Sequence, residues 1–276
     1  MSAARSGREG QMTRIATKVF AWIVLAFLVA PLLAIFPLSF SSGTILTLPV
    51  PGYSLQWYEE FFLNDRWLDA TRNSFIVGTA TMVLATLLGT TAAYGLNMSN
   101  FRGKQIVLVL LSMPMVVPLI VTAASMFLAF SAVGLANTLW GLVIAHTIIA
   151  TPYVVITVLA SLQTFDPNLM RGALSLGAPP VTAFREVVLP MILPGVAAGA
   201  IFAFATSFDE LVIAIFITGP GEFTLPRQMF AGLREFLSPT IAAAAVIMIL
   251  LSFVLLFVSE AVRRRGEKLV ARRANQ

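Results

Sequence analysis

Long hydrophobic runs, separated by short polar segments, dominate the pattern of this chain. Each run is about 20 residues long, which is the length that crosses a bilayer as a helix. The runs are Val19–Phe40, Phe75–Leu96, Ile106–Phe130, Leu139–Leu162, Gly195–Ile217 and Ile241–Val258. The pattern therefore predicts an all-α polytopic membrane protein with six transmembrane helices.

The first run follows a basic stretch, as a secretory signal peptide would. It is longer than the apolar region of a signal peptide, however, and no small-x-small cleavage site closes it. We expect a retained helix over residues 19–40, after a tail at 1–18 and before an outer loop at 41–72. In that loop Trp57, Phe61 and neighbouring acids predict an interfacial helix. A simple aromatic anchor at the membrane surface is the alternative.

Composition and charge support a membrane protein and orient it. Hydrophobic residues make up 58% of the chain and charged residues 11%, whereas soluble domains carry about 25% charged residues. If both termini are cytoplasmic, 14 of the 18 Lys and Arg residues lie on the inner side, as the positive-inside rule requires. The basic tail at 261–276 is therefore interpreted as an orientation signal and membrane anchor, with no role in nucleic-acid binding.

A polar segment interrupts the hydrophobic pattern between the fourth and fifth runs. Asp166 before Pro167 predicts a helix start, with a small apolar face at Leu169, Gly172, Ala173 and Leu176. Gly177, which tolerates a positive φ, and the prolines at 179–180 should end that helix. A second helix should then present Phe184, Val187 and Val188 on one side before Pro190 and Pro194 bend the chain into the fifth run. Such a hinged element suits docking into a groove of a partner protein.

The residue spacing in this segment resembles the "EAA" loop of ABC importer permeases. The matching positions are Arg171, Gly172, Ala173, Gly177, Val187, Leu189 and Pro190. Arg171 stands where the family usually has Glu, which removes one expected ion pair with the ATPase. The resemblance implies that residues 165–193 couple this chain to that ATPase.

Two further segments, residues 66–96 and 207–230, resemble the same family, the latter the spermidine/putrescine-type permeases. The resemblance implies a type I permease core over residues 71–260 in a bacterial inner membrane. It also implies a homologous permease partner, two ATPase subunits that bind ATP and Mg²⁺, and a periplasmic solute-binding protein. A polyamine is the expected solute; ferric iron or a phosphonate would use the same machinery.

Asp209 and Glu210 are the chemical anomaly, because they fall within the fifth run. An ionised acid at the bilayer centre costs about 2.5–3.5 kcal/mol on insertion scales. Neighbouring positions on a helix point about 100° apart, so we expect one acid to face the translocation path and the other a subunit interface. Phe204 and Phe208 lie close in sequence and could add cation–π contacts to a polyamine. A polar clamp on the partner subunit is the alternative.

Two other features concern the bundle interior. Pro114 and Pro118 predict a bent third helix, and broken helices often line transport paths. Where the resemblance leads one to expect an acid after the second proline, this chain has Leu119. His146, the only histidine, lacks the partners for a metal site and is expected to hydrogen-bond within the bundle.

The sequence contains no G-x-x-x-x-G-K-[ST] motif, so we expect no ATP site or other cofactor in this chain. The short loops show no catalytic or metal-binding constellation, which argues against an enzyme. Two rivals to the importer remain. An ion-driven transporter using Asp209 and Glu210 would work alone in a proton or sodium gradient, and a membrane scaffold would tolerate changes at Gly177 without loss of uptake.

Overall fold

The computed structural model describes residues 2–235 and 238–274, and side chains within residues 14–234, 238–261 and at 264. The described part is helical, with one isolated bridge between Ser41 and Tyr53. The chain divides into two compact units. One comprises the residues up to Leu63 together with Gly232–Ile249, and the other comprises Asn64–Ala231 and the residues from Leu250 onward.

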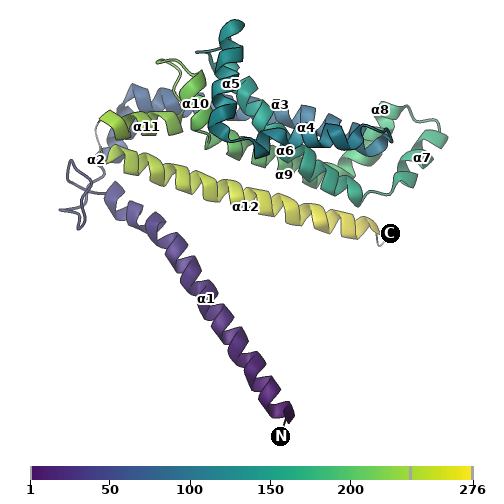
Figure 1. The fold of residues 1–276 in the computed structure, drawn as a ribbon, viewed down its shortest axis with the longest axis horizontal. Helices are drawn as coiled ribbons and strands as arrows, with labels where there is room; N and C mark the ends of the chain where they lie inside the picture. The colour runs from purple at the N-terminus through teal and green to yellow at the C-terminus, as the bar shows by residue number, and fades with distance from the viewer. Residues whose placement is uncertain (1, 236–237, 275–276) are drawn as a thin grey trace. The chain divides into compact units, whose positions relative to one another are not determined.

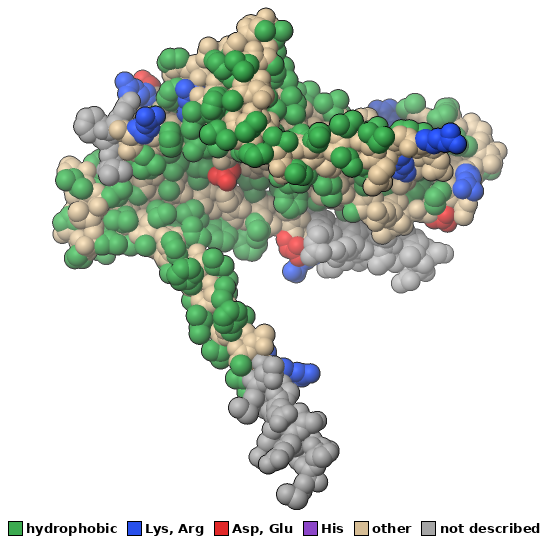
Figure 2. Space-filling view, viewed as in Figure 1, with side chains coloured by type: hydrophobic (Ala, Val, Ile, Leu, Met, Phe, Trp, Pro, Cys, Tyr) green, Lys and Arg blue, Asp and Glu red, His purple; other side chains and the backbone are tan. Residues whose placement is uncertain are grey.

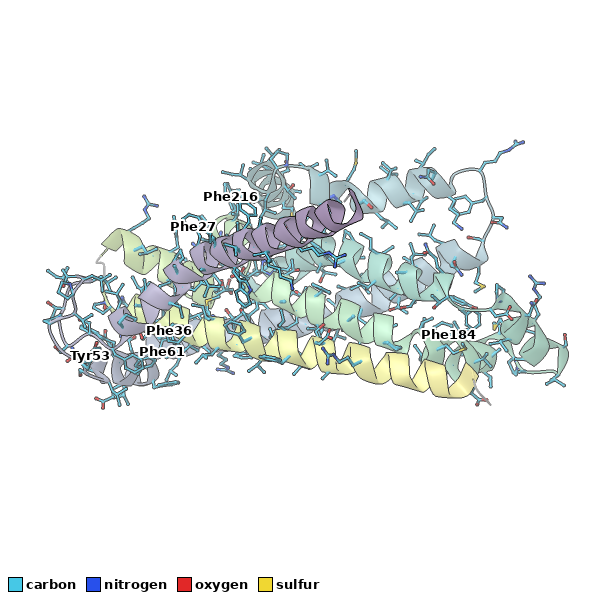
Figure 3. All side chains as sticks on the ribbon, turned by 90° about the horizontal axis from the view of Figure 1, so that it is seen from below. Phe27, Phe36, Tyr53, Phe61, Phe184 and Phe216 are labelled. Atoms are coloured by element: carbon cyan, nitrogen blue, oxygen red, sulfur yellow. The ribbon has the colours of Figure 1, made fainter. Side chains whose placement is uncertain are left out.

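The first unit contains α1 (Ser2–Ser39), α2 (Gln56–Leu63) and the start of α12 (Thr240–Ala274). Aromatic side chains of α2 hold the loop that follows α1. Tyr58 shares a 2.8 Å hydrogen bond with the Ser39 hydroxyl, and Trp57 donates from Nε1 to the Ser41 carbonyl at 2.6 Å. Phe61, labelled in Figure 3, is buried. A short helix therefore forms where the interfacial helix was predicted.

In the described residues, the second unit takes in α12 from Leu250 onward, together with nine other α-helical segments and one π-helical turn. They are α3 (Asp65–Met98), α4 (Lys104–Val116), α5 (Leu119–Ala132), α6 (Leu139–Gln163), α7 (Pro167–Ser175), α8 (Pro180–Ala183), η1 (Phe184–Val188), α9 (Leu189–Phe208), α10 (Val212–Ile217) and α11 (Leu225–Glu235), whose last residues belong to the first unit.

Helices α3, α6 and α9 pack together as the core of this unit (Figure 1). Small residues allow α6 and α9 to approach closely. A Cβ placed on Gly199 would lie 2.6 Å from the Thr157 hydroxyl and 3.1 Å from the Val154 Cα, so only glycine fits there. The central part of α9 is consequently locked against α6.

Five described helices are long and apolar enough to cross a membrane: Arg14–Ser39, Asp65–Met98, Leu139–Gln163, Pro180–Phe208 and Thr240–Ala261. The third predicted run instead forms α4 and α5, which are bent by 103°. Val117 is extended at the break (φ −70°, ψ 134°), because the ring of the following Pro118 disfavours the helical conformation. Pro114 remains inside α4. The predicted bend is confirmed, and it is a complete break of the helix.

One predicted span is wrong. The fifth run is not one helix over Gly195–Ile217, because α9 ends at Phe208 and α10 begins only at Val212. The final predicted span, Ile241–Val258, agrees with the apolar part Thr240–Ala261, and the helix itself continues through the predicted tail to Ala274. Charged residues are compatible with a helix in water, so the end of a hydrophobic run marks the end of a membrane span and not of the helix.

Candidate functional site

The polar segment between α6 and α9 begins and turns as predicted. Asp166 caps α7 by accepting a 2.9 Å hydrogen bond from the Asn168 N–H. Gly177 has φ +89°, and its N–H donates to the Leu174 carbonyl while the Ala178 N–H donates to the Ala173 carbonyl. This pair of bonds is the Schellman motif, in which a glycine in the left-handed region ends a helix.

The apolar side chains of α7 divide between the core and the surface. Met170 is buried, and Ala173 packs against the same hydrophobic cluster. Leu169 is 45% exposed and Leu176 is 90% exposed, so most of the face predicted at Leu169, Gly172, Ala173 and Leu176 points away from the protein. Isolated exposed leucines are ordinary, but here they lie on and beside α7, close in sequence to Val181 of α8, which is also exposed.

The second half of the segment is not a separate helix, which corrects the prediction. Helix α8, the η1 turn and α9 follow one another without interruption. Pro190 directly follows the η1 turn inside this continuous helix, where its missing N–H leaves a carbonyl of the preceding turn without a helical donor. The side predicted to be apolar packs against the chain itself: Phe184, labelled in Figure 3, lies 4.7 Å from the Tyr94 ring between centroids, and Val188 is buried.

Figure 2 shows hydrophobic side chains over most of the visible face of the second unit. A group of Lys and Arg side chains lies at the end that carries α7 and α8. Arg171 and Arg185 are exposed in this segment. The segment therefore offers a partner protein both positive charge and apolar side chains.

At the other end of α9, Asp209 and Glu210 lie at the break before α10 and have opposite environments. Asp209 is exposed, whereas Glu210 is 6% exposed. Both carboxylate oxygens of Glu210 accept from the Ile213 N–H, at 3.0 and 2.9 Å, and one also accepts from the Ala214 N–H at 3.2 Å. A carboxylate at a helix N-terminus satisfies otherwise unpaired N–H groups and complements the helix dipole.

The expectation that one acid faces a neighbouring subunit is therefore wrong for Glu210, whose carboxylate is buried within its own chain. The expected 100° between the two side chains holds only for neighbouring residues within one helix. Helix α9 ends at Phe208, with Asp209 as its C-cap, so this angle does not apply to Asp209 and Glu210. Asp209 is the carboxylate of the pair that remains available at the surface of this chain.

His146, on α6, joins the same buried network. Its Nδ1 lies 2.8 Å from the Ser207 hydroxyl on α9, and its Nε2 lies 3.3 Å from Oε2 of Glu210. The expected hydrogen bond within the bundle is confirmed. The acidic neighbour was missed, because the rest of α6, then α7, α8, η1 and α9, separate residues 146 and 210 in the sequence, which carries no signal of their contact.

Arg227, one of the four Lys and Arg residues that the charge pattern places outside, holds the C-terminal end of α10. Its guanidinium donates to the Ala214 carbonyl at 2.9 Å and to both oxygens of Thr218, and it lies 4.2 Å above the Phe223 ring. Burial lowers the pKa of the Arg227 guanidinium from its ordinary value, but arginine stays charged in proteins. The negative Glu210 carboxylate thus lies at the N-terminal end of α10 and the positive Arg227 guanidinium at its C-terminal end. Both charges interact favourably with the helix dipole.

Phe204 and Phe208 are buried and pack with each other and with Phe75 of α3. The ring centroids of Phe204 and Phe208 are 5.5 Å apart, and Phe75 lies 5.2 Å from Phe208. Phe75 itself is 43% exposed, so the aromatic cluster has one open edge. Among the described residues, no group of three His, Cys, Asp or Glu side chains could hold a metal ion.

Residues 85–268 match the family described as "Binding-protein-dependent transport system inner membrane component". The chain is 34% identical over 247 residues to the spermidine/putrescine transport system permease protein PotC of Haemophilus influenzae, covering 90% of this chain and 96% of that protein. It is 32% identical to the putrescine transport system permease protein PotI of Escherichia coli, with 88% of each chain covered.

A similar fold occurs in the crystal structure of a bacterial alginate ABC transporter in complex with an alginate pentasaccharide-bound periplasmic protein. The TM-score is 0.72 at 15% identity, over 94% of this chain and 96% of that chain. An inward-facing methionine ABC transporter, MetNI, gives a TM-score of 0.59 at 16% identity, over 72% of this chain and 95% of that chain. At these identities the likeness concerns the fold alone.

Proposed function

Because the chain belongs to the family of binding-protein-dependent transport system inner membrane components, we propose that it is a permease subunit of an ATP-driven importer for polyamines such as putrescine and spermidine. The polyamine assignment rests on the similarity to PotC and PotI over most of the chain. It agrees with the chemistry of the break after α9, where Asp209 offers an exposed carboxylate.

The coupling to ATP is proposed to pass through the segment at 165–193. Arg171 and Gly172 are exposed on α7, Ala173 is half-buried on the same helix, and Gly177 is exposed in the turn that follows. Val187, Leu189 and Pro190 lead into and begin α9. Two ATPase subunits would hold ATP and Mg²⁺ and dock on this turn, and a homologous permease would complete the membrane part. A periplasmic binding protein would deliver the solute, and both termini would be cytoplasmic.

The cation path is proposed to include Asp209, with Phe204 and Phe208 beneath it. Polyamines carry several ammonium groups, which bind carboxylates as charge-assisted hydrogen bonds. Glu210 belongs to the same site through its position, but its carboxylate is engaged by the N–H groups of α10. Its proposed contribution is therefore to shape the site. The same machinery with another solute, iron or a phosphonate, is the alternative within the family.

The test is uptake of radiolabelled spermidine and putrescine by proteoliposomes containing the whole transporter with its binding protein. We expect uptake that requires ATP and that a proton or sodium gradient does not replace. Gradient-driven uptake by this chain alone would establish the ion-coupled rival. ATP-dependent uptake of iron or a phosphonate, without polyamine uptake, would redirect the substrate assignment.

Asp209→Asn tests the path itself. Removing the charge should raise the KM for spermidine roughly tenfold, because a charge-assisted hydrogen bond is weakened. Asp69→Asn, at another exposed acid of the same chain, is the matched control and should leave the KM unchanged. The cation-path proposal fails if Asp209→Asn and Glu210→Gln both transport with the affinity and rate of the unmodified protein.

A further inference from the structure

A buried polar network surrounds His146. The imidazole is fully buried on α6, and it contacts Ser207 at the end of α9 and Glu210 at the break. Two parts of the chain that are far apart in the sequence, α6 and the end of α9 with the break after it, meet at this one side chain. A buried polar network is costly if a member loses its partner, so each contact constrains where the others can lie.

Glu210 links this network to α10. Its carboxylate binds the N–H groups of Ile213 and Ala214, and both of those side chains are fully buried. Helix α10 has only six residues, too few to be stable without such contacts. Its position therefore depends on groups outside it, and the Glu210 carboxylate is the one at its N-terminal end.

The position of Asp209 depends on the same anchor. Asp209 lies between the last residue of α9 and Glu210, so the backbone on its C-terminal side is fixed by whatever holds Glu210. The Nε2 of His146 lies beside the Glu210 carboxylate, at 3.3 Å from Oε2. Without that imidazole, the buried Glu210 carboxylate would lose its neighbour on α6. The break between α9 and α10 would then lose a contact that holds it against α6.

We propose that His146 is a positioning residue for transport: through Glu210 it fixes the break between α9 and α10 and so presents the Asp209 carboxylate to the transported cation. This inference rests on the proposed function, since it assigns His146 a role at the site given to Asp209. It predicts that the affinity for the cation depends on the nitrogen atom that faces Glu210 more than on the one that faces Ser207.

Two substitutions separate the two nitrogens of His146. The amide nitrogen of Gln reaches about as far as Nε2, and that of Asn about as far as Nδ1. His146→Gln should therefore keep the contact with Glu210, His146→Asn should keep the contact with Ser207, and His146→Leu should keep neither. Thr147→Val is the matched control, since Thr147 is a buried polar neighbour on α6 whose hydroxyl donates to the Val143 carbonyl of its own helix.

The first measurement is spermidine uptake against concentration in proteoliposomes holding the whole transporter. We expect His146→Leu to raise the KM roughly tenfold, because the buried Glu210 carboxylate loses the polar neighbour that lies 3.3 Å from its Oε2. His146→Gln should stay within about threefold of the unmodified protein, and His146→Asn should resemble His146→Leu. Thr147→Val should leave the KM unchanged. An unaltered KM with a lower maximal rate in all three His146 variants would overturn the proposal, as would rescue by Asn and not by Gln.

The second measurement needs no substrate and so separates this inference from the proposed function. The chain has no cysteine, so a single Ile213→Cys reports on α10 through its reaction with a membrane-impermeant thiol reagent. The Ile213 side chain is fully buried, and the thiol should be protected in the parent and in Thr147→Val. We expect labelling at least about fivefold faster after His146→Leu but not after His146→Gln, as expected when a local opening becomes more populated.

The two measurements can fail independently of each other. If the unmodified transporter takes up no polyamine, the proposed function fails, and changed labelling would still establish that His146 positions α10. If uptake occurs but labelling is the same in all variants, His146 does not hold α10 and the inference fails. If even His146→Gln prevents assembly of the transporter, the residue serves folding and the inference is likewise overturned.

Discussion

The two ends of α9 both adjoin polar residues, yet the chain treats them in opposite ways. At the N-terminal end, Leu176 and Val181 are exposed on a turn shaped by Gly177. At the C-terminal end, Glu210 and Arg227 are engaged by the backbone of α10. One end leaves apolar side chains without cover from their own chain, and the other satisfies its charges internally.

This difference distinguishes a surface that another protein can cover from a site whose contacts all come from the same chain. An exposed apolar turn gains stability only when a partner covers it, whereas a buried carboxylate or guanidinium must find its partners in the same chain. Between them, the middle of α9 is packed against α6 at Gly199. Substitutions at the exposed turn, in the middle of α9 and at the break before α10 should therefore differ widely in their effect on the free energy of unfolding.

The largest effect is expected where α9 meets α6. Gly199→Leu would place a side chain against the Thr157 hydroxyl and the Val154 backbone, and overpacking of this kind costs about 3 kcal/mol or more. The matched control is Gly95→Leu, because a Cβ at Gly95 meets nothing within 4 Å. Thermal unfolding in detergent, followed by the fraction that remains monodisperse, should separate the two. Equal stability of the Gly199→Leu and Gly95→Leu variants would show that α9 is not packed rigidly against α6 at Gly199.

The next largest effect is expected at the internally satisfied end. Glu210→Ala removes the carboxylate that binds the first N–H groups of α10, which should lower the free energy of unfolding by about 2–3 kcal/mol. Asp209→Ala, at the neighbouring exposed acid, should change it by less than about 0.5 kcal/mol. The same unfolding assay compares them. If Asp209→Ala were the more destabilising, the assignment of the buried and exposed acids would be reversed.

Arg227 should contribute somewhat less, because it holds only the C-terminal end of α10. Arg227→Leu removes the guanidinium donor from both Thr218 oxygens and one of the donors from the Ala214 carbonyl, and it should cost about 1–2 kcal/mol. Arg227→Lys should restore part of that loss, since a lysine supplies the charge but not the planar fork. Arg234→Leu, at an exposed arginine, is the control and should be neutral. A neutral Arg227→Leu would mean that α10 is held from its N-terminal end alone.

The sequence predicted the elements whose ends carry a local chemical signal. Asp166–Pro167 starts α7, Gly177 ends it, and Pro118 breaks the third run, and each of these acts through its own backbone preference. The limits of α6 were also predicted to within a residue, because its hydrophobic run and its helix coincide.

The sequence failed at the break after Phe208. Residues 211–217 continue the hydrophobic run without proline or glycine, so periodicity and length favoured one long helix. The pair Asp209–Glu210 was an available signal, since acids are favoured in the first turn of a helix. The contacts of His146 and Arg227 could not be predicted, because they join residues that only the packing of separate helices brings together.

The turn at the N-terminal end offers a smaller and purely conformational test. Gly177 has φ +89°, so Gly177→Ala should cost about 1 kcal/mol. Gly172→Ala is a matched change on α7, equally free of neighbours within 4 Å but helical, and should stabilise the helix by about 0.5–1 kcal/mol. Opposite signs in the unfolding assay are expected. The same sign at both positions would show that the turn does not constrain the segment.

Leu176 should show the smallest effect on stability and the clearest effect on coupling. Its side chain is 90% exposed, so Leu176→Asp should change the free energy of unfolding by less than about 0.5 kcal/mol. If an ATPase subunit covers this turn, burying a carboxylate there is unfavourable, and spermidine uptake should fall while the membrane part stays folded. Leu176→Met keeps an apolar side chain of similar volume and should retain uptake. Measuring uptake together with co-purification of the ATPase subunit distinguishes lost docking from lost transport. Full uptake with Leu176→Asp would show that the ATPase subunit does not bind at the exposed turn before α9. The difference in exposure between the two ends of α9 would then not correspond to a difference in function.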